Sequence, residues 1–185
     1  MPVQIPYVRE IEFEYGDCDQ VSPLIRRVVA NNPSAFTYKG TGTYIIGKGE
    51  VAVVDPGPLL NEHVGALMRA LEGETVTHIL ITHTHSDHSP AAAPLKALTG
   101  AETYAYGPHG SGQLNTPDDV QVEEDGDTAF VPDFEIRHGD VIEGNGWTVE
   151  CVYTPGHTSN HMCFALQEEK ALFSGDHVMG WSTSI

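Results

Sequence analysis

The spacing of apolar residues predicts short strands in the first half of the chain. The segment "GTYIIGKGEVAVVDPGP" predicts two strands, 43–46 and 51–54, joined by a turn at 47–49. The second strand ends at 55–58, where Asp-Pro-Gly-Pro favours a turn. "VTHILIT" (76–82) is a continuous apolar run, which is typical of a strand covered on both faces.

Two other segments have the periodicity of helices. In "LNEHVGALMRALEG" (60–73) the apolar residues fall on one helical face, and these are Leu60, Val64, Leu67, Met68 and Leu71. "SPAAAPLKALTG" (89–100) predicts a second helix with Ser89 as its cap and Gly100 as its end. Pro94 should shift the start of this helix or kink its first turns.

The order of strand, strand, helix, strand and helix indicates an α/β fold. From 107 to 146 the periodicity weakens and acidic residues accumulate, so the segment "TPDDVQVEEDGDTAFVPDFE" is interpreted as a solvated excursion on the surface. Three more strands are expected in "WTVECVYTPG" and "HMCFALQEEKALFSGD", the last two paired around 168–170. With 185 residues, the chain is expected to form one domain, 1–185.

Charge narrows the range of partners. The chain has 26 acidic and 9 basic residues, and its formal net charge is −17. Such a surface repels phosphate backbones and anionic lipid, which disfavours a nucleic-acid substrate and favours a small molecule. No apolar run approaches the roughly 20 residues that cross a bilayer, and the N-terminus has no secretory signal, so we expect a cytoplasmic protein without membrane contact.

The cysteines carry no recognisable chemistry. Cys18, Cys151 and Cys163 form no C-x-x-C pair. Cys151 and Cys163 lie in apolar strand-like runs, which favours buried free thiols.

A cluster of metal-type residues follows the strand 76–82. His83, His85, Asp87 and His88 lie within six positions, and alternate residues of a strand project to one side. Packed without a partner, these groups repel each other when protonated and lose solvation when buried, so a divalent metal is the expected compensation. His157 and Asp176 follow two later strands, and strand ends of an α/β sandwich gather at one edge.

Other histidines are weaker candidates. His63, His78, His109 and His138 are expected to be ordinary structural residues. His161 and His177 each lie beside an expected ligand, so either a structural role or a supporting contact stays open for them.

The motifs "THTHSDHS", "TPGHTSNH" and "FSGDH" resemble the three metal motifs of the metallo-β-lactamase-like hydrolase superfamily, and "VVDPGP" resembles its Asp-x-Gly strand end. Within it, "TPGHTSNHM" followed by "LFSGDHVMG" looks most like the lactamase-β-like 2 branch. The resemblance implies an αβ/βα sandwich with up to two zinc ions. It assigns His83, His85 and His157 to the first zinc, Asp87 and His88 to the second, Asp176 as a bridge, and Asp55 as a brace behind the ligands.

One motif of the superfamily has no match here. Its second metal takes a further histidine downstream, and no histidine follows His177 in this sequence. We therefore expect the second half of the sandwich to be truncated, with 1–185 as the N-terminal portion of a longer chain. The second metal should then be weakly held, and exposed sheet surface should favour self-association.

The sequence predicts a zinc-dependent hydrolase in which a metal-activated water, steered by Asp87, cleaves an ester, a thioester or a related small-molecule bond. Two alternatives stay open: a single-stranded RNA endonuclease, suggested by the branch resemblance, and a metal-binding fragment without catalysis.

Overall fold

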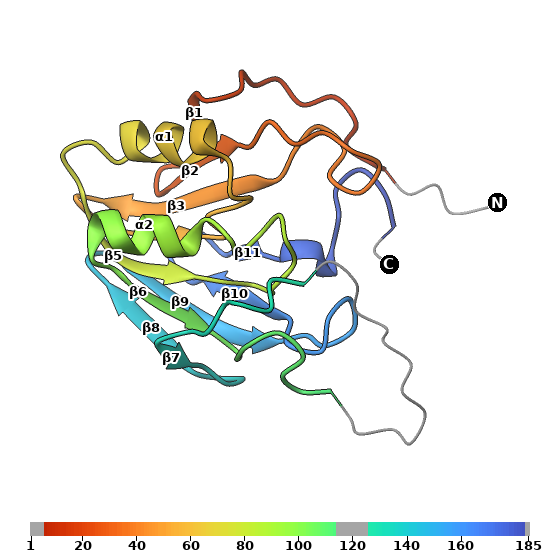
Figure 1. The fold of residues 1–185 in the computed structure, drawn as a ribbon. Helices are drawn as coiled ribbons and strands as arrows, with labels where there is room; N and C mark the ends of the chain where they lie inside the picture. The colour runs from red at the N-terminus through yellow and green to blue at the C-terminus, as the bar shows by residue number, and fades with distance from the viewer. Residues whose placement is uncertain (1–5, 114–125, 184–185) are drawn as a thin grey trace.

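Two facing β-sheets form the framework of the protein (Figure 1). The structure is a computed structural model and describes residues 6–113 and 126–183. In the larger sheet, seven strands follow one another in chain order: β1 (Cys18–Gln20), β2 (Ile25–Val29), β3 (Gly42–Lys48), β4 (Glu50–Val54), β5 (Thr75–Leu80), β6 (Glu102–Ala105) and β7 (Phe134–Glu135). The smaller sheet has the order β11 (Ala171–Phe173), β10 (Met162–Leu166), β9 (Trp147–Tyr153) and β8 (Val141–Gly144).

The larger sheet separates two hydrophobic cores because neighbouring strand residues point to opposite faces. In β4, Val51 and Val53 pack in the core beneath the helices α1 (Asn61–Ala70) and α2 (Ala92–Thr99). Ala52 and Val54 point the other way, into the core between the two sheets. Both faces of β4 are therefore buried, as its unbroken apolar run requires.

The predicted α/β sandwich is confirmed, with small shifts in element bounds. Strands β3 and β4 form the expected hairpin, and β4 then pairs in parallel with β5 across the α1 crossover. Strands β10 and β11 pair around residues 167–170, also as expected. Both α-helices lie on the face of the larger sheet that points away from the smaller sheet (Figure 1).

The predicted cap of the second helix, Ser89, is wrong, whereas the predicted shift of its start and its end at Gly100 are confirmed. Helix α2 begins at Ala92, and its cap residue Ala91 makes no side-chain cap hydrogen bond. Ser89 instead donates from Oγ to Asp127 Oδ2, 2.9 Å away. Pro94 lies in the first helical turn, where amide groups have no partner inside the helix, so the proline shifts the start without breaking the helix.

The interpretation of 116–135 as a solvated excursion is wrong for its last residues, because Phe130 is buried beneath the helices and β7 ends the segment. Strand β8 lies in the weakly periodic stretch that follows, where Ile136 and Ile142 are buried between the sheets. Such short strands, separated by Gly, Pro and acids, give too few alternating positions to be recognised by period. Residues 114–125, which hold much of the acidic run, lie outside the described residues.

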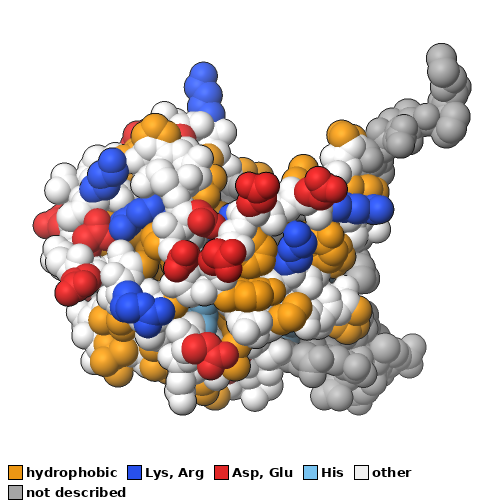
Figure 2. Space-filling view, turned by 90° about the horizontal axis from the view of Figure 1, so that it is seen from above, with side chains coloured by type: hydrophobic (Ala, Val, Ile, Leu, Met, Phe, Trp, Pro, Cys, Tyr) orange, Lys and Arg blue, Asp and Glu red, His pale blue; other side chains and the backbone are white. Residues whose placement is uncertain are grey.

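The surface of the described chain mixes charges of both signs. On the face seen from above, basic side chains are interspersed with acidic and apolar ones (Figure 2). Among residues 6–113 and 126–183, no helix is long and apolar enough to cross a bilayer.

Candidate metal centre

Three loops at one end of the sheets bring the candidate ligands together. His83 and His85 follow β5, His157 lies in the loop after β9, and Asp176 lies in the short 3-10 turn after β11. At this end Met162 N donates to Thr82 O at 2.7 Å, which ties the start of β10 to the end of the β5 strand. The two sheets are thus held together directly beside the cluster.

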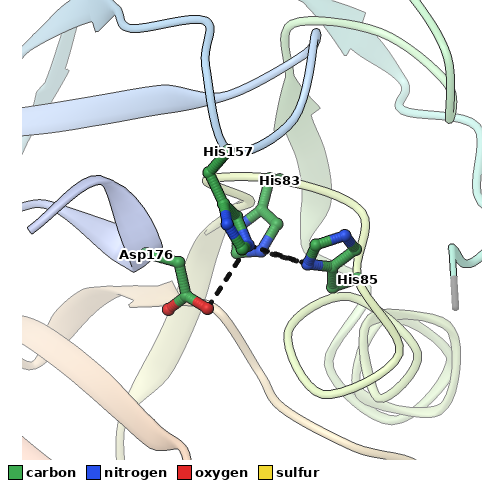
Figure 3. Close-up of side chains that lie close together, drawn as sticks. All are labelled: His83, His85, His157 and Asp176. Atoms are coloured by element: carbon green, nitrogen blue, oxygen red, sulfur yellow. Dashed lines mark hydrogen bonds and ion pairs between the residues drawn. The ribbon is translucent and has the colours of Figure 1, made fainter. Parts of the chain in front are cut away.

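His83, His85, His157 and Asp176 each offer one ligand atom, and these four atoms lie within 4.8 Å of one another. The side chains point toward one another from their separate loops (Figure 3). His85 Nδ1 lies 3.1 Å from His83 Nε2 and 2.9 Å from His157 Nε2. His157 Nε2 lies 3.5 Å from Asp176 Oδ2.

These distances fit a cation better than hydrogen bonds alone. His85 Nδ1 carries either one proton or one lone pair, so it cannot satisfy both neighbouring nitrogens. Zinc–nitrogen bonds of about 2.0–2.1 Å in a tetrahedron separate ligand atoms by about 3.3 Å, close to the observed spacing. Burial, followed by the neighbouring imidazoles, lowers the pKa of His83 well below its usual value. Burial and His157 also lower the pKa of His85, so both rings stay neutral and keep lone pairs for a metal.

His88 lies beside this group and is surrounded by carboxylates. Its Nε2 lies 3.4 Å from Asp87 Oδ2 and 3.4 Å from Asp176 Oδ1, while its Nδ1 lies 2.9 Å from Asp55 Oδ2. Burial alone would lower the pKa of His88, but the three carboxylates raise it well above the usual value. Three carboxylates around one ring, one of them buried and two partly buried, favour a positive charge there, which a proton or a metal at Nε2 can supply.

Asp55 braces the loop that carries the ligands. It is buried, and its backbone φ of 48° lies in the left-handed region. Its carboxylate accepts hydrogen bonds from Thr82 N at 2.8 Å and Thr82 Oγ1 at 2.7 Å. The contact with His88 Nδ1 leaves His88 Nε2 free to face Asp87 and Asp176, which is the arrangement expected for an orienting residue.

Asp87 is held by Thr41, whose Oγ1 donates to Asp87 Oδ2 at 2.6 Å. Burial would raise the pKa of Asp87, but His88 and the hydrogen bond from Thr41 hold it well below the usual range. Asp87 is therefore a carboxylate at neutral pH. Thr41 lies in a loop before β3 and belongs to no motif, so its role could not be predicted from the sequence.

The structure thus brings His83, His85, His157 and Asp176 into one group and places Asp87, His88 and Asp55 beside it. The histidines expected to be structural are absent from this group of described residues. His63, for example, is buried and lies 3.0 Å from Thr43 Oγ1 through its Nε2. Sequence reasoning missed Thr82, which links Asp55 to His83 Nδ1 at 3.0 Å, although its place directly before the cluster is a usable signal.

An apolar cavity of about 490 Å³ opens beside the cluster. Asp87, His88 and Asp176 lie in its wall. Its other walls are mainly apolar and aromatic, with Phe13, Val29, Phe36, Tyr38, Tyr44, Phe173, Met179 and Trp181 among the lining residues. Tyr38 stacks on Trp181 with ring centroids 5.2 Å apart, which joins the loop before β3 to the segment after β11.

The fold and the cluster together define a family. Residues 39–183 match the model of the metallo-beta-lactamase superfamily, and the chain belongs to that superfamily. The superfamily prediction is confirmed, while the closer placement in the lactamase-β-like 2 branch stays a prediction.

Among curated relatives, the chain is 37% identical over 171 residues to an atrochrysone carboxyl ACP thioesterase of Cryptosporiopsis sp. (strain 8999), covering 91% of this chain and 48% of that protein. It is 33% identical over 174 residues to a lactamase-like protein of Aspergillus sp. (strain MF297-2), covering 91% and 49%. The chain spans about half the length of the curated relatives it matches.

Solved structures agree on the fold. A beta-lactamase domain protein from Burkholderia ambifaria superimposes with a TM-score of 0.72 at 19% identity, covering 97% of this chain and 63% of that one. A metallo-beta-lactamase family protein from Thermus thermophilus gives a TM-score of 0.66 at 25% identity, covering 89% and 63%.

Proposed function

We propose that this chain carries the metal centre of a hydrolase that cleaves a thioester. The observation that carries the proposal is the convergence of His83, His85, His157 and Asp176 on one point. Relatives with about one third identity, including one from Aspergillus terreus, bear the name atrochrysone carboxyl ACP thioesterase, which supports a thioester among the bonds expected. The excess of 26 acidic over 9 basic residues favours a small acyl substrate over RNA.

In this proposal His83, His85, His157 and Asp176 would hold zinc, and Asp87, His88 and Asp176 would hold a second ion. A bound divalent cation supplies Lewis acidity that lowers the pKa of a water molecule and polarises the thioester carbonyl. Histidines that stay neutral at pH 7 suit this role because their lone pairs are free.

Two carboxylates of the chain, Asp87 and Asp55, have separate roles in this proposal. Asp87, ionised and fixed by Thr41, accepts a hydrogen bond from the attacking water and orients it. Asp55 fixes the ring of His88. In the reaction, the water oxygen bonds to the carbonyl carbon, the carbon–sulfur bond breaks, and the thiol leaves with a proton.

The adjoining cavity supports an apolar acyl group as the substrate. Its mainly apolar and aromatic lining suits an apolar group, and its volume of about 490 Å³ is within the range of small-molecule sites. The cytoplasmic location expected from the sequence stays a prediction.

The test is hydrolysis of an aromatic acyl thioester reporter by zinc-loaded protein, beside its oxygen-ester analogue and a phosphodiester reporter. We expect zinc-dependent turnover of the thioester that is lost in His157→Ala and kept in His78→Ala, a histidine on β5 outside the cluster. Turnover of the phosphodiester alone would favour the RNA alternative. Zinc binding without turnover of any reporter would favour the non-catalytic alternative.

A further inference from the structure

His161 is a buried histidine that lies behind the candidate ligands and has no established task. Its side chain is fully buried, and its Nε2 has no hydrogen-bond partner among the described residues. Its Nδ1 lies 2.9 Å from Thr154 Oγ1. A buried ring nitrogen without a partner lowers stability, so the position needs an explanation beyond filling space.

The first contact of His161 is with a candidate ligand. Its ring stacks on that of His83, with centroids 5.0 Å apart and planes inclined by 27°. At the edge of the His83 ring, Nδ1 lies 3.0 Å from Thr82 Oγ1. His83 is thus fixed by Thr82 at one ring nitrogen and by His161 across one ring face.

The second contact closes the loop that carries His157. Thr154 N donates to His161 O at 3.0 Å, and the Thr154 hydroxyl meets His161 Nδ1. The two residues at the ends of this loop are therefore joined through both backbone and side chains. His157, in the middle of the loop, is positioned by this closure.

The third contact reaches the turn that carries Asp176. A Cβ atom at Gly175 would lie 2.8 Å from His161 Nε2 and 2.6 Å from Thr82 Oγ1. Gly175 has a φ of +47°, so both the space and the backbone conformation favour glycine there. The His161 ring therefore limits how closely the turn before Asp176 approaches the other ligands.

We propose that His161 is a positioning residue of the metal centre, whose ring sets the spacing of the segments that carry His83, His157 and Asp176. It needs no charge for this role. Burial lowers the pKa of His161 to about 3, which agrees with a neutral ring acting by shape and by one hydrogen bond. The inference rests on the metal centre of the proposed function.

The test compares metal binding in three variants with metal binding in the wild-type protein. His161→Ala removes both the ring and its hydrogen bond, His161→Phe keeps a flat ring, and Thr154→Val removes only the hydroxyl. The readouts are the zinc dissociation constant from competition with a chelator and the absorption spectrum of the cobalt(II)-loaded protein, which reports ligand geometry. Thermal unfolding is measured beside them.

His78→Ala is the matched control. His78 also contacts an aromatic ring, that of Tyr104 at 5.0 Å, and its Nδ1 lies 2.8 Å from Thr77 Oγ1. His78→Ala should lower the unfolding temperature while leaving zinc affinity within about twofold. His161→Ala should weaken zinc binding by about 10–100-fold and change the cobalt spectrum, as loss of an orienting contact does. His161→Phe should restore much of the affinity, and Thr154→Val should lose several-fold.

Unchanged zinc affinity and cobalt spectrum in His161→Ala would overturn the inference, even if the variant were less stable. If His161→Ala does not fold, Thr154→Val decides, and unchanged affinity in that variant would overturn it. A wild-type protein that binds no zinc would instead contradict the proposed function itself.

Discussion

At the scale of single residues, the candidate site includes groups that hold its loops without belonging to the cluster of four candidate ligands. Asp55 is an example, because its carboxylate joins Thr82 to His88 while its own backbone is left-handed. The resemblance to the superfamily predicted an orienting role for Asp55. It could not predict the partners, because hydrogen bonds between residues far apart in the chain depend on how the loops fold.

Asp55→Asn should weaken zinc binding by about 10–100-fold while keeping the fold. The amide places an NH2 group where one oxygen now accepts from Thr82 or faces His88 Nδ1, so one of those contacts is lost. Asparagine tolerates the left-handed backbone, so the turn itself should survive. Zinc competition and circular dichroism measure the two effects.

The matched control is Asp133→Asn. Asp133 likewise accepts from a threonine amide and hydroxyl, those of Thr103, both at 2.8 Å. It lies outside the cluster, so its variant should bind zinc as the wild type does. Equal zinc affinity in both variants would remove the orienting role from Asp55.

The thiols should differ sharply in reactivity. Cys18 is exposed, whereas Cys151 and Cys163 are buried and free, which confirms the expectation for those two. Burial, then Asp140 and Glu150, raises the pKa of Cys151 from 9.0 to about 12. A thiol reagent at pH 8 should therefore label one cysteine in the native protein and three in denaturant. Rapid native labelling of all three would contradict the described packing.

The raised pKa of Cys151 also predicts how the free energy of unfolding depends on pH. Because the folded pKa of Cys151 lies above that of the unfolded thiol, its contribution to stability is complete below pH 9 and is lost as the pH rises toward 12. Cys151→Ser, which does not ionise in this range, should show a shallower loss of unfolding free energy between pH 9 and 12. Equal slopes in the two proteins would contradict the shift.

At the scale of elements, the ligand-bearing segments were predictable and their neighbours were not. His83 and His85 alternate after an apolar strand, and His157 and Asp176 each follow a further strand, so all were predicted to meet at one sheet edge. Strands β1, β2, β6, β7 and β8 were missed, since they are short and amphipathic patterns need several periods to be recognised. Pairing with longer neighbouring strands, rather than local pattern, holds such segments in a sheet.

The turn after β11 should be sensitive to one added methyl group. In Gly175→Ala the alanine has to adopt a left-handed backbone, which costs about 1 kcal/mol. Its added methyl group would also lie too close to Thr82 and His161. Gly73→Ala shares the positive φ, +79°, but its Cβ meets nothing within 4 Å. Gly175→Ala should therefore lose more unfolding free energy in urea than Gly73→Ala, and it alone should lose zinc affinity. Equal losses of stability with unchanged zinc binding would show that the close approach has no consequence.

At the scale of the whole molecule, a seven-stranded sheet faces a four-stranded one. β11 pairs only with β10 among the described strands, and Leu172 on it is 53% exposed beside the apolar cavity. An open strand edge with apolar residues favours association between chains. The self-association expected from the sequence stays a prediction, and so does a longer chain that continues the domain.

Light scattering across a range of protein concentrations should reveal this association. Leu172→Glu should shift the average mass toward the monomer, because a charge at the strand edge opposes pairing. Leu98→Glu, at an equally exposed leucine on α2, should leave the mass unchanged. A monomer at all concentrations in the unsubstituted protein would exclude the association.

The central claim is that three imidazoles and one carboxylate hold a divalent cation. It is tested most directly by zinc stoichiometry and affinity, measured by equilibrium dialysis with elemental analysis, for the wild type and His85→Ala. His85 Nδ1 lies close to both other imidazole nitrogens of the group, so its loss should remove most of the bound zinc. We predict at least one tightly bound zinc per wild-type chain and little in the variant. Equal zinc stoichiometry and affinity in the two proteins, or no zinc in either, would contradict the account.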